Sequence, residues 1–274
     1  MEFLGKAFSL SIESLELSLD QHVTFFSVGS IVMIVTGKDD ETNKSKNAEI
    51  FDMASGMLLK CPKIQPFPFD RLYGASGGIV DGSPMICGGY SPTDPQSVTT
   101  CHSLNQNGHW IEDQTSTVNP GRVLSGSVVM QNQLLMVGGW TPGIRHDYQS
   151  TWLNSIVALK PNTRPTTLAI QLPLGFLRKT CVVPWNDKTF FVIGGESNES
   201  SREARTYFVN IENERVTPGP ALHRGRREHG CQEIMVQGQP YIVVGGYKTE
   251  MLKKEMGQSW TEGKQKLKTR FFSS

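Results

Sequence analysis

Short apolar runs recur along the chain, and each of them ends at a glycine. Four runs close with Gly-Gly, and the first closes with Thr-Gly. Apolar runs of this length, bounded by Gly or Pro, indicate buried β-strands, because an α-helix needs about 10 to 12 residues. The five copies span residues 31–38, 84–90, 134–140, 189–196 and 240–247. The pattern therefore predicts an all-β chain with helices nearly absent.

A second strand-like stretch precedes each run and is joined to it by a short turn. Four of the turns carry residue types that favour tight hairpins: Asp81-Gly82, Asn132-Gln133, Asn186-Asp187 and Gln237-Gly238. After the glycines, a polar loop leads to third strands, expected at 48–53, 98–104, 154–161 and 204–212, and then to outer strands such as 109–114 and 214–222. Each unit is therefore predicted to contain four antiparallel strands.

The units repeat with a period near fifty residues. The second glycine of each copy is at position 37, 89, 139, 195 or 246, so that successive copies lie 50 to 56 residues apart. A four-stranded unit cannot bury both of its faces alone, so copies are expected to stack radially into a β-propeller. Two adjacent glycines allow the chain to leave a crowded strand with φ values that other residues resist. The sequence predicts a propeller of about five recognisable blades.

The repeat resembles the Kelch repeat over residues 23–270. The shared features are a strand that ends in Gly-Gly, an Arg followed by a small residue before the next unit, and an aromatic outer strand, represented here by Trp110 and Trp260. The phrase Arg227-Glu228-His229-Gly230 is similar to the family's own. A WD-repeat propeller is the competing architecture, but the chain has no Trp-Asp dipeptide. The resemblance implies a Kelch-type propeller, like that of BTB-Kelch adaptors but without a BTB or BACK part.

Three regions are expected along the chain. Residues 1–21 form an N-terminal extension that could supply a closing strand, residues 22–247 contain the Kelch repeats, and residues 248–274 form a basic C-terminal segment that could supply outer strands of the last blade. Residues 250–256 contain helix formers and few β-branched residues, so either a shortened strand or a helical tail fits them. Kelch propellers most often have six blades, whereas five are recognisable here, so the sequence does not decide whether the ring closes.

Charge and cysteine content restrict the partners and the location. The 274 residues include 27 Lys and Arg against 26 Asp and Glu, so no overall field favours nucleic acid or an anionic membrane. Residues 1–20 lack a basic start and carry Glu13 and Glu16, so no signal peptide is predicted and a cytoplasmic location is expected. The five cysteines form no CxxC pair, and Cys87, Cys101 and Cys181 are expected to be reduced core residues.

Motifs that could carry catalysis have structural interpretations here. Residues 74–78 match G-x-S-x-G, but a strand follows them rather than the helix that a nucleophile elbow needs. The six histidines lack metal-binding spacing, and no nucleotide-binding glycine motif is present, so we predict no metal, no cofactor and no enzyme activity. Asn198-Glu199-Ser200 is a glycosylation sequon, which is attributed to chance in the absence of a signal peptide. The alternative is a propeller enzyme acting on a sugar or another small molecule, as in galactose oxidase-like proteins.

A recurring arginine supplies the candidate binding site. Arg71, Arg122, Arg178 and Arg227 precede the second glycine of the following run by 18, 17, 17 and 19 residues, which predicts four cations around one mouth of the channel. Guanidinium groups hold carboxylates in a bidentate manner. The resemblance to BTB-Kelch ubiquitin ligase adaptors implies that arginines at this position help to bind acidic peptides. Weaker candidates follow the glycine pairs: Tyr90, Trp140, Glu196 and Tyr247.

These observations predict a non-enzymatic module that binds a protein or peptide, expected to be acidic, as a substrate receptor or scaffold. Neither nucleic acid nor a membrane is an expected partner. The competing interpretation of the arginines is structural: they would pair with carboxylates of neighbouring blades and hold the loops.

Overall fold

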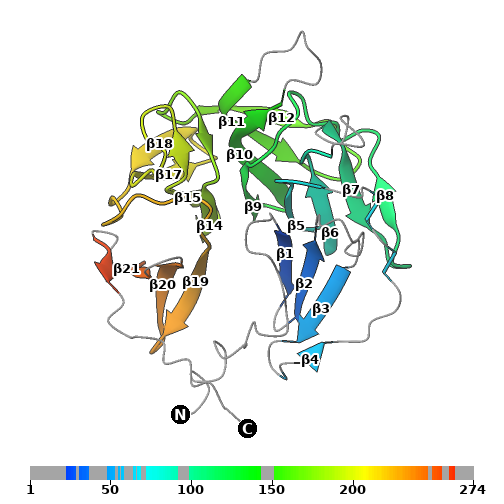
Figure 1. The fold of residues 1–274 in the computed structure, drawn as a ribbon, viewed down its shortest axis with the longest axis horizontal. Coiled ribbons are helices and arrows are strands. Elements are labelled where there is room, and N and C mark those ends of the chain that lie inside the picture. Colours follow the sequence, from blue (N-terminus) through cyan, green and yellow to red (C-terminus); the bar gives the residue numbers. More distant parts are fainter. Residues whose placement is uncertain are drawn as a thin grey trace.

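The described residues fold almost entirely into β-structure. The computed structural model describes residues 23–28, 31–36, 48–52, 55, 57–58, 64–65, 67–68, 72–91, 99–142, 151–245, 249–254 and 259–262. They form five four-stranded antiparallel sheets and one two-stranded sheet (Figure 1). No helix in these residues is long and apolar enough to cross a bilayer. The all-β prediction is confirmed.

Each four-stranded sheet is a meander whose strands follow one another in the chain. Sheet 1 contains β1 (Val23–Val28), β2 (Ile31–Thr36), β3 (Ala48–Asp52) and β4 (Met57–Leu58), and sheet 2 contains β5 (Ser76–Val80), β6 (Ser83–Cys87), β7 (Cys101–Leu104) and β8 (Trp110–Glu112). Sheet 3 contains β9 (Gly126–Met130), β10 (Gln133–Thr141), β11 (Thr151–Leu159) and β12 (Thr166–Gln171). Sheet 4 contains β14 (Cys181–Asn186), β15 (Thr189–Ile193), β17 (Thr206–Asn210) and β18 (Arg215–Pro218). Sheet 5 contains β19 (Cys231–Val236), β20 (Gln239–Val244), β21 (Glu250–Lys253) and β22 (Thr261–Glu262), and the small sheet pairs β13 (Leu177–Arg178) with β16 (Glu196–Ser197).

The sheets follow one another side by side along an arc (Figure 1). The first strands of successive sheets contact one another, from β1 to β5, β9, β14 and β19. This radial order is compatible with a β-propeller. The segment 250–253 is a strand paired with β20, so the strand alternative holds there and the helical one does not. The closing strand expected from residues 1–21 lies outside the described residues.

The hairpin turns follow from residues that tolerate a positive φ. In sheet 2, Asp81 and Gly82 have φ values of 50° and 73°, as the two-residue turn between β5 and β6 requires. In sheet 3 the turn is formed by Gln131 and Asn132, one residue before the predicted position. In sheet 4 the hairpin contains a register shift between Pro184 and Asn186 that the sequence did not indicate. This bulge matters for the site described below.

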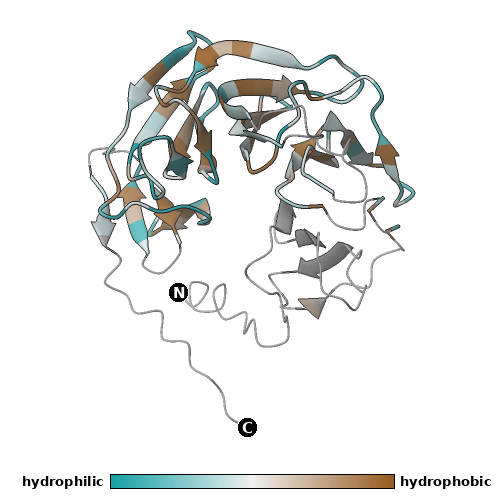
Figure 2. Cartoon of the chain, turned by 45° about the horizontal axis from the view of Figure 1, so that its top comes forward, coloured by the Kyte–Doolittle hydropathy of each residue, from teal (hydrophilic) through white to brown (hydrophobic). Residues whose placement is uncertain are grey.

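The apolar core lies between neighbouring sheets, and apolar residues concentrate on their strands (Figure 2). One cluster joins sheets 3 and 4 and includes Val137, Ile156 and Phe190. Equivalent clusters join sheet 2 to sheet 3 and sheet 4 to sheet 5, the latter through Phe191 and the buried Trp260. Sheets 2 to 5 thus pack apolar faces against their neighbours, which is why a single unit would not be stable alone.

Two disulfide bonds contradict the expectation of reduced cysteines. Cys87 and Cys101 face each other on β6 and β7, with Cα atoms 4.1 Å apart. Cys181 and Cys231 begin β14 and β19, the first strands of sheets 4 and 5, and their Cα atoms are 5.9 Å apart. The second pair is separated by 50 residues, so only the radial stacking of sheets brings it together. Cys61 lies outside the described residues.

Candidate interaction site at the loop end of the sheets

The candidate residues gather at one end of the sheets, which we call the loop end. Consecutive strands are antiparallel, so the connections from second to third strand and from one sheet to the next lie at this same end. In sheets 2, 3 and 4, the residue after the glycine pair bridges to the incoming connection: Tyr90 to Tyr73, Trp140 to Val123, and Glu196 to Arg178. The repeat therefore presents equivalent backbone positions at this end.

A chain of backbone hydrogen bonds links four successive sheets at the loop end. Leu124 N donates to Gly74 O at 2.8 Å, Lys179 N donates to Leu124 O at 2.9 Å, and Glu228 N donates to Lys179 O at 3.1 Å. All four residues have a left-handed backbone, with φ values between 52° and 64°. Only one of them is glycine, which is why the sequence did not reveal this chain.

These left-handed residues show which arginines are structurally equivalent. The residues two positions earlier are Leu72, Arg122, Leu177 and Arg226, and those one position earlier are Tyr73, Val123, Arg178 and Arg227. The predicted ring of equivalent arginines is therefore wrong for Arg122. Arg122 and Arg178 have the same spacing to the second glycine, but the bulge at Pro184 and Asn186 adds one residue to the hairpin of sheet 4. Arg71 lies outside the described residues.

Arg122 is a buried residue that stabilises the fold rather than a surface cation. Its side chain is fully buried, and its Nη1 donates hydrogen bonds to Gly138 O at 2.9 Å and to Ser155 O at 2.8 Å. Its Nη2 donates to Ser155 Oγ at 2.8 Å. Burial lowers the pKa of Arg122 to about 10, so the group remains a cation at neutral pH. Arg122 ties the glycine turn of β10 to β11 and is not accessible to a partner.

Glu196 bridges the other two arginines. Arg178 Nη2 lies 2.6 Å from Glu196 Oε1, and Arg227 Nη1 lies 3.0 Å from Glu196 Oε2. Burial opposes ionisation of Glu196, but the hydrogen bond from Arg178 and the charges of both arginines outweigh it, so the pKa of Glu196 lies below its ordinary value. The Arg227 side chain is 35% exposed and that of Arg178 is 19% exposed. Unlike Arg122, this pair reaches the surface.

An aromatic surface adjoins the arginine pair. The Arg178 guanidinium carbon lies 4.2 Å from the ring centroid of Trp152, which is 38% exposed at the start of β11. The ring of Phe176 stacks on Trp152 with centroids 4.6 Å apart. Trp140, the residue of β10 opposite Trp152, has its ring centroid 5.9 Å from that of Trp152. We call Trp140, Trp152, Phe176 and Arg178 the Trp152 stack. The sequence indicated Trp140 and Arg178 but missed Trp152 and Phe176, which lie outside the repeated motif.

The remaining predicted residues lie apart from this stack. Tyr90 is half-buried and packs against Val123 and Leu124, between sheets 2 and 3. Its bridge partner Tyr73 is 39% exposed. Tyr247 lies outside the described residues. The structure therefore brings together Arg178, Glu196 and Arg227 with Trp140, and leaves Tyr90 at the neighbouring joint.

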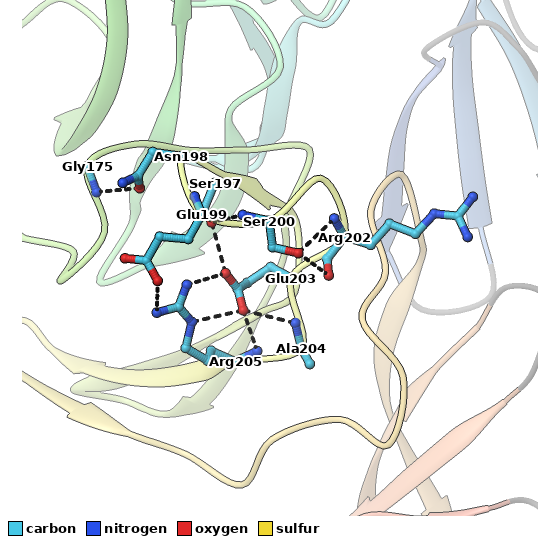
Figure 3. A network of polar contacts seen from close by, with 9 residues as sticks. All are labelled: Gly175, Ser197, Asn198, Glu199, Ser200, Arg202, Glu203, Ala204 and Arg205. Atoms are coloured by element: carbon cyan, nitrogen blue, oxygen red, sulfur yellow. Dashed lines mark hydrogen bonds and ion pairs between the residues drawn. The ribbon is translucent and has the colours of Figure 1, made fainter.

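An ion pair between the buried Glu203 and the exposed Arg205 fixes the loop that follows Glu196 (Figure 3). Glu203 accepts hydrogen bonds from Arg205 Nε at 2.9 Å and Nη2 at 2.6 Å, and from Ser197 Oγ at 2.9 Å. Burial favours the protonated carboxyl, but the hydrogen bonds from Arg205 outweigh it and lower the pKa of Glu203 to about 2. Since Ser197 is the neighbour of Glu196, this network holds the bridging carboxylate in place.

The described residues contain no group of three or more His, Cys, Asp or Glu side chains placed to hold a metal ion. No model of a known protein family matches the chain, and no curated protein matches it. The function must therefore be argued from the geometry of the loop end.

Proposed function

We propose that the chain is a Kelch-type β-propeller of about five blades that acts as a receptor or scaffold, binding a partner protein or peptide without catalysing a reaction. The observation that carries the proposal is the Trp152 stack beside Arg227. Trp, Tyr and Arg are the residue types that dominate binding energy at interfaces. Here an exposed Trp ring and two arginines share one surface, and neighbouring backbone hydrogen bonds hold them in place.

The preferred ligand carries a carboxylate. Glu196 lies between Arg178 and Arg227 and contacts both of them. The two guanidinium groups are therefore spaced so that a single carboxylate can contact both. Arg227 Nε also lies 4.0 Å from Glu228 Oε2, and Lys179 pairs with the same carboxylate, so three cations and two carboxylates leave the cluster with one net positive charge. An Asp or Glu of a partner would contact the exposed side of Arg227 or compete with Glu196 for both arginines. An adjacent apolar or aromatic side chain of the partner would pack on Trp152.

The test is a binding measurement with defined peptides. The purified chain is titrated with a library of fluorescent peptides rich in Asp, Glu and aromatic residues, and with a matched library in which Asn and Gln replace the acids. We expect binding to the acidic library only. Trp152→Ala and Arg227→Ala should each weaken it by about tenfold or more, equivalent to roughly 1.4 kcal/mol.

Two further variants separate this site from general charge attraction. Glu196→Gln removes the internal competitor and should strengthen binding of acidic peptides. Arg215→Ala removes an exposed cation at the start of β18, at the opposite end of sheet 4, and should leave binding unchanged. Equal binding of both libraries, or equal losses in Arg215→Ala and Arg227→Ala, would overturn the proposal.

A further inference from the structure

The sequon Asn198-Glu199-Ser200 lies on the surface of sheet 4, in the connection between β16 and β17. Asn198 is exposed, and its Oδ1 accepts a hydrogen bond from Gly175 N at 3.0 Å (Figure 3). This bond anchors the side chain through its oxygen and does not involve Nδ2, the atom to which an N-linked glycan attaches. Asn198 Nδ2 is therefore held at the surface without taking part in the hydrogen bond to Gly175.

Contacts within the folded chain order the residues around Asn198. The side-chain amide lies against Gly175, where a Cβ atom would come within 3.0 Å of Asn198 Cγ. The backbone N–H groups of Glu199 and Ser200 both donate to Ser197 Oγ at 3.2 Å, and Ser200 Oγ donates to Arg202 O at 2.8 Å. The tripeptide is thus an ordered surface turn, and a glycan attached there would extend from it without displacing core residues.

The disulfide bonds provide an independent observation about the compartment. Both Cys87–Cys101 and Cys181–Cys231 are formed, and structural disulfides form and persist in oxidising environments such as the secretory pathway. N-linked glycans are added in that same pathway. The bonds therefore favour an oxidising compartment over the cytoplasmic location expected from the sequence, and they remove the reason for attributing the sequon to chance.

We propose that Asn198 is an N-glycosylation site of a chain that matures in an oxidising secretory compartment. The donor is an oligosaccharide carried on a lipid diphosphate, supplied with its transferase by the host cell. Asn198 Nδ2 attacks the anomeric carbon, an N–C bond forms, and the C–O bond to the diphosphate breaks. One amide proton is lost and the lipid diphosphate leaves, with no change of oxidation state.

Peptide mass spectrometry tests the proposal. The full chain is secreted from eukaryotic cells with an added leader and treated with an amidase that removes N-glycans in heavy-oxygen water. We expect a heavy-oxygen Asp at position 198, together with a cross-linked peptide containing Cys181 and Cys231. Asn198→Gln and Ser200→Ala should abolish the label, whereas Ser200→Thr, which preserves the sequon, should retain it.

Two controls keep the outcome unambiguous. A second sequon, Asn43-Lys44-Ser45, is read from its own peptide and removed by Asn43→Gln, so its occupancy is not mistaken for that of Asn198. The peptide containing Asn198 is also read from endogenous protein, which does not depend on how the variants fold. Unmodified Asn198 in secreted, disulfide-bonded protein would overturn the proposal, as would free Cys181 and Cys231 thiols with unmodified Asn198 in the endogenous protein.

Discussion

Arg122 and Arg178 stand at the same distance before a glycine pair, yet one is buried in the molecule and the other reaches its surface. Arg122 is fully buried and donates to backbone oxygens of β10 and β11. Arg178 lies on Trp152 and shares Glu196 with Arg227. The bulge in the hairpin of sheet 4 adds one residue between the left-handed Lys179 and the glycine pair, so Arg178, one position before Lys179, has the same spacing to its glycine pair as Arg122, which lies two positions before Leu124.

The two joints also differ in what holds them. At sheet 3, Arg122 itself binds the turn to the neighbouring strand. Between sheets 4 and 5, the Cys181–Cys231 bond joins the first strands, and Arg226, in the position equivalent to Arg122, pairs with the buried Glu250 within sheet 5. Arg178 and Arg227 lie one position closer to the left-handed residues and share Glu196 nearer the surface. A shift of one position therefore separates a buried arginine from one that reaches the surface.

The largest expected effect is the loss of the disulfide between sheets 4 and 5. Replacing Cys181 and Cys231 with Ser should lower the free energy of unfolding by about 4 kcal/mol, because the bond closes a loop of about 50 residues in the unfolded chain. Urea unfolding of the variant and of the oxidised wild type measures the change. A loss below about 1 kcal/mol would show that other contacts hold this joint.

Arg122→Ala is expected to cost about 3 kcal/mol of unfolding free energy, because Ser155 O and Oγ lose their guanidinium donor and Gly138 O retains the hydrogen bond from Ser125 Oγ but loses that from Arg122. Arg122→Lys should recover only part of the loss, since an ammonium cannot reproduce the planar arrangement of donors. The exposed Arg164→Ala serves as the control and should be neutral. An equally neutral Arg122→Ala would remove the distinction between the two joints.

Acid should lower the stability of the fold through two buried histidines, His102 and His229, in the same pH range. Burial lowers the pKa of His102 in sheet 2 and of His229 before sheet 5 to about 4, and the charge of Arg226 adds to the effect at His229. The unfolded chain, with the pKa of His near 6.5, binds more protons than the native state between pH 6.5 and 4. Stability is therefore present above pH 6.5 and falls as the pH decreases toward 4.

The urea midpoint measured against pH checks this dependence. His102→Gln and His229→Gln should each flatten the slope between pH 6.5 and 4, and the double variant should flatten it further. A slope that is unchanged in both single variants would assign the acid sensitivity to other groups.

The smallest expected effect on stability is that of Arg227→Ala. Its pair with Glu196 is partly exposed, and such pairs contribute roughly 0 to 1 kcal/mol. The thermal midpoint should therefore move little while binding of acidic peptides falls. A stability loss as large as that of Arg122→Ala would give Arg227 the same stabilising role and would contradict its assignment to the binding surface.

Local features of the fold were predictable from the sequence. The third strands of sheets 2 to 4, the fourth strands of sheets 2 and 4 and the hairpins follow from apolar runs, glycine pairs and turn residues, with shifts of one residue at turns such as Gln131 and Asn132. The sequence did not predict the bounds of β12 or the small sheet of β13 and β16. The site was predictable in part: Arg178, Glu196 and Arg227 do meet, together with Trp140. Trp152 and Phe176 were missed because nothing in the repeat distinguishes them before the loops are placed.

The sequence by itself determined an all-β chain of repeated four-stranded units, because strand periodicity and turn chemistry depend on neighbouring residues. The tertiary structure decided which arginine is buried, which cysteines pair and which aromatic residues form the exposed stack. Those properties depend on contacts between sheets about 50 residues apart in the chain, such as Cys181 with Cys231. One bulged residue in sheet 4 also gives Arg178 and Arg122 the same spacing to a glycine pair although they occupy different positions in the fold.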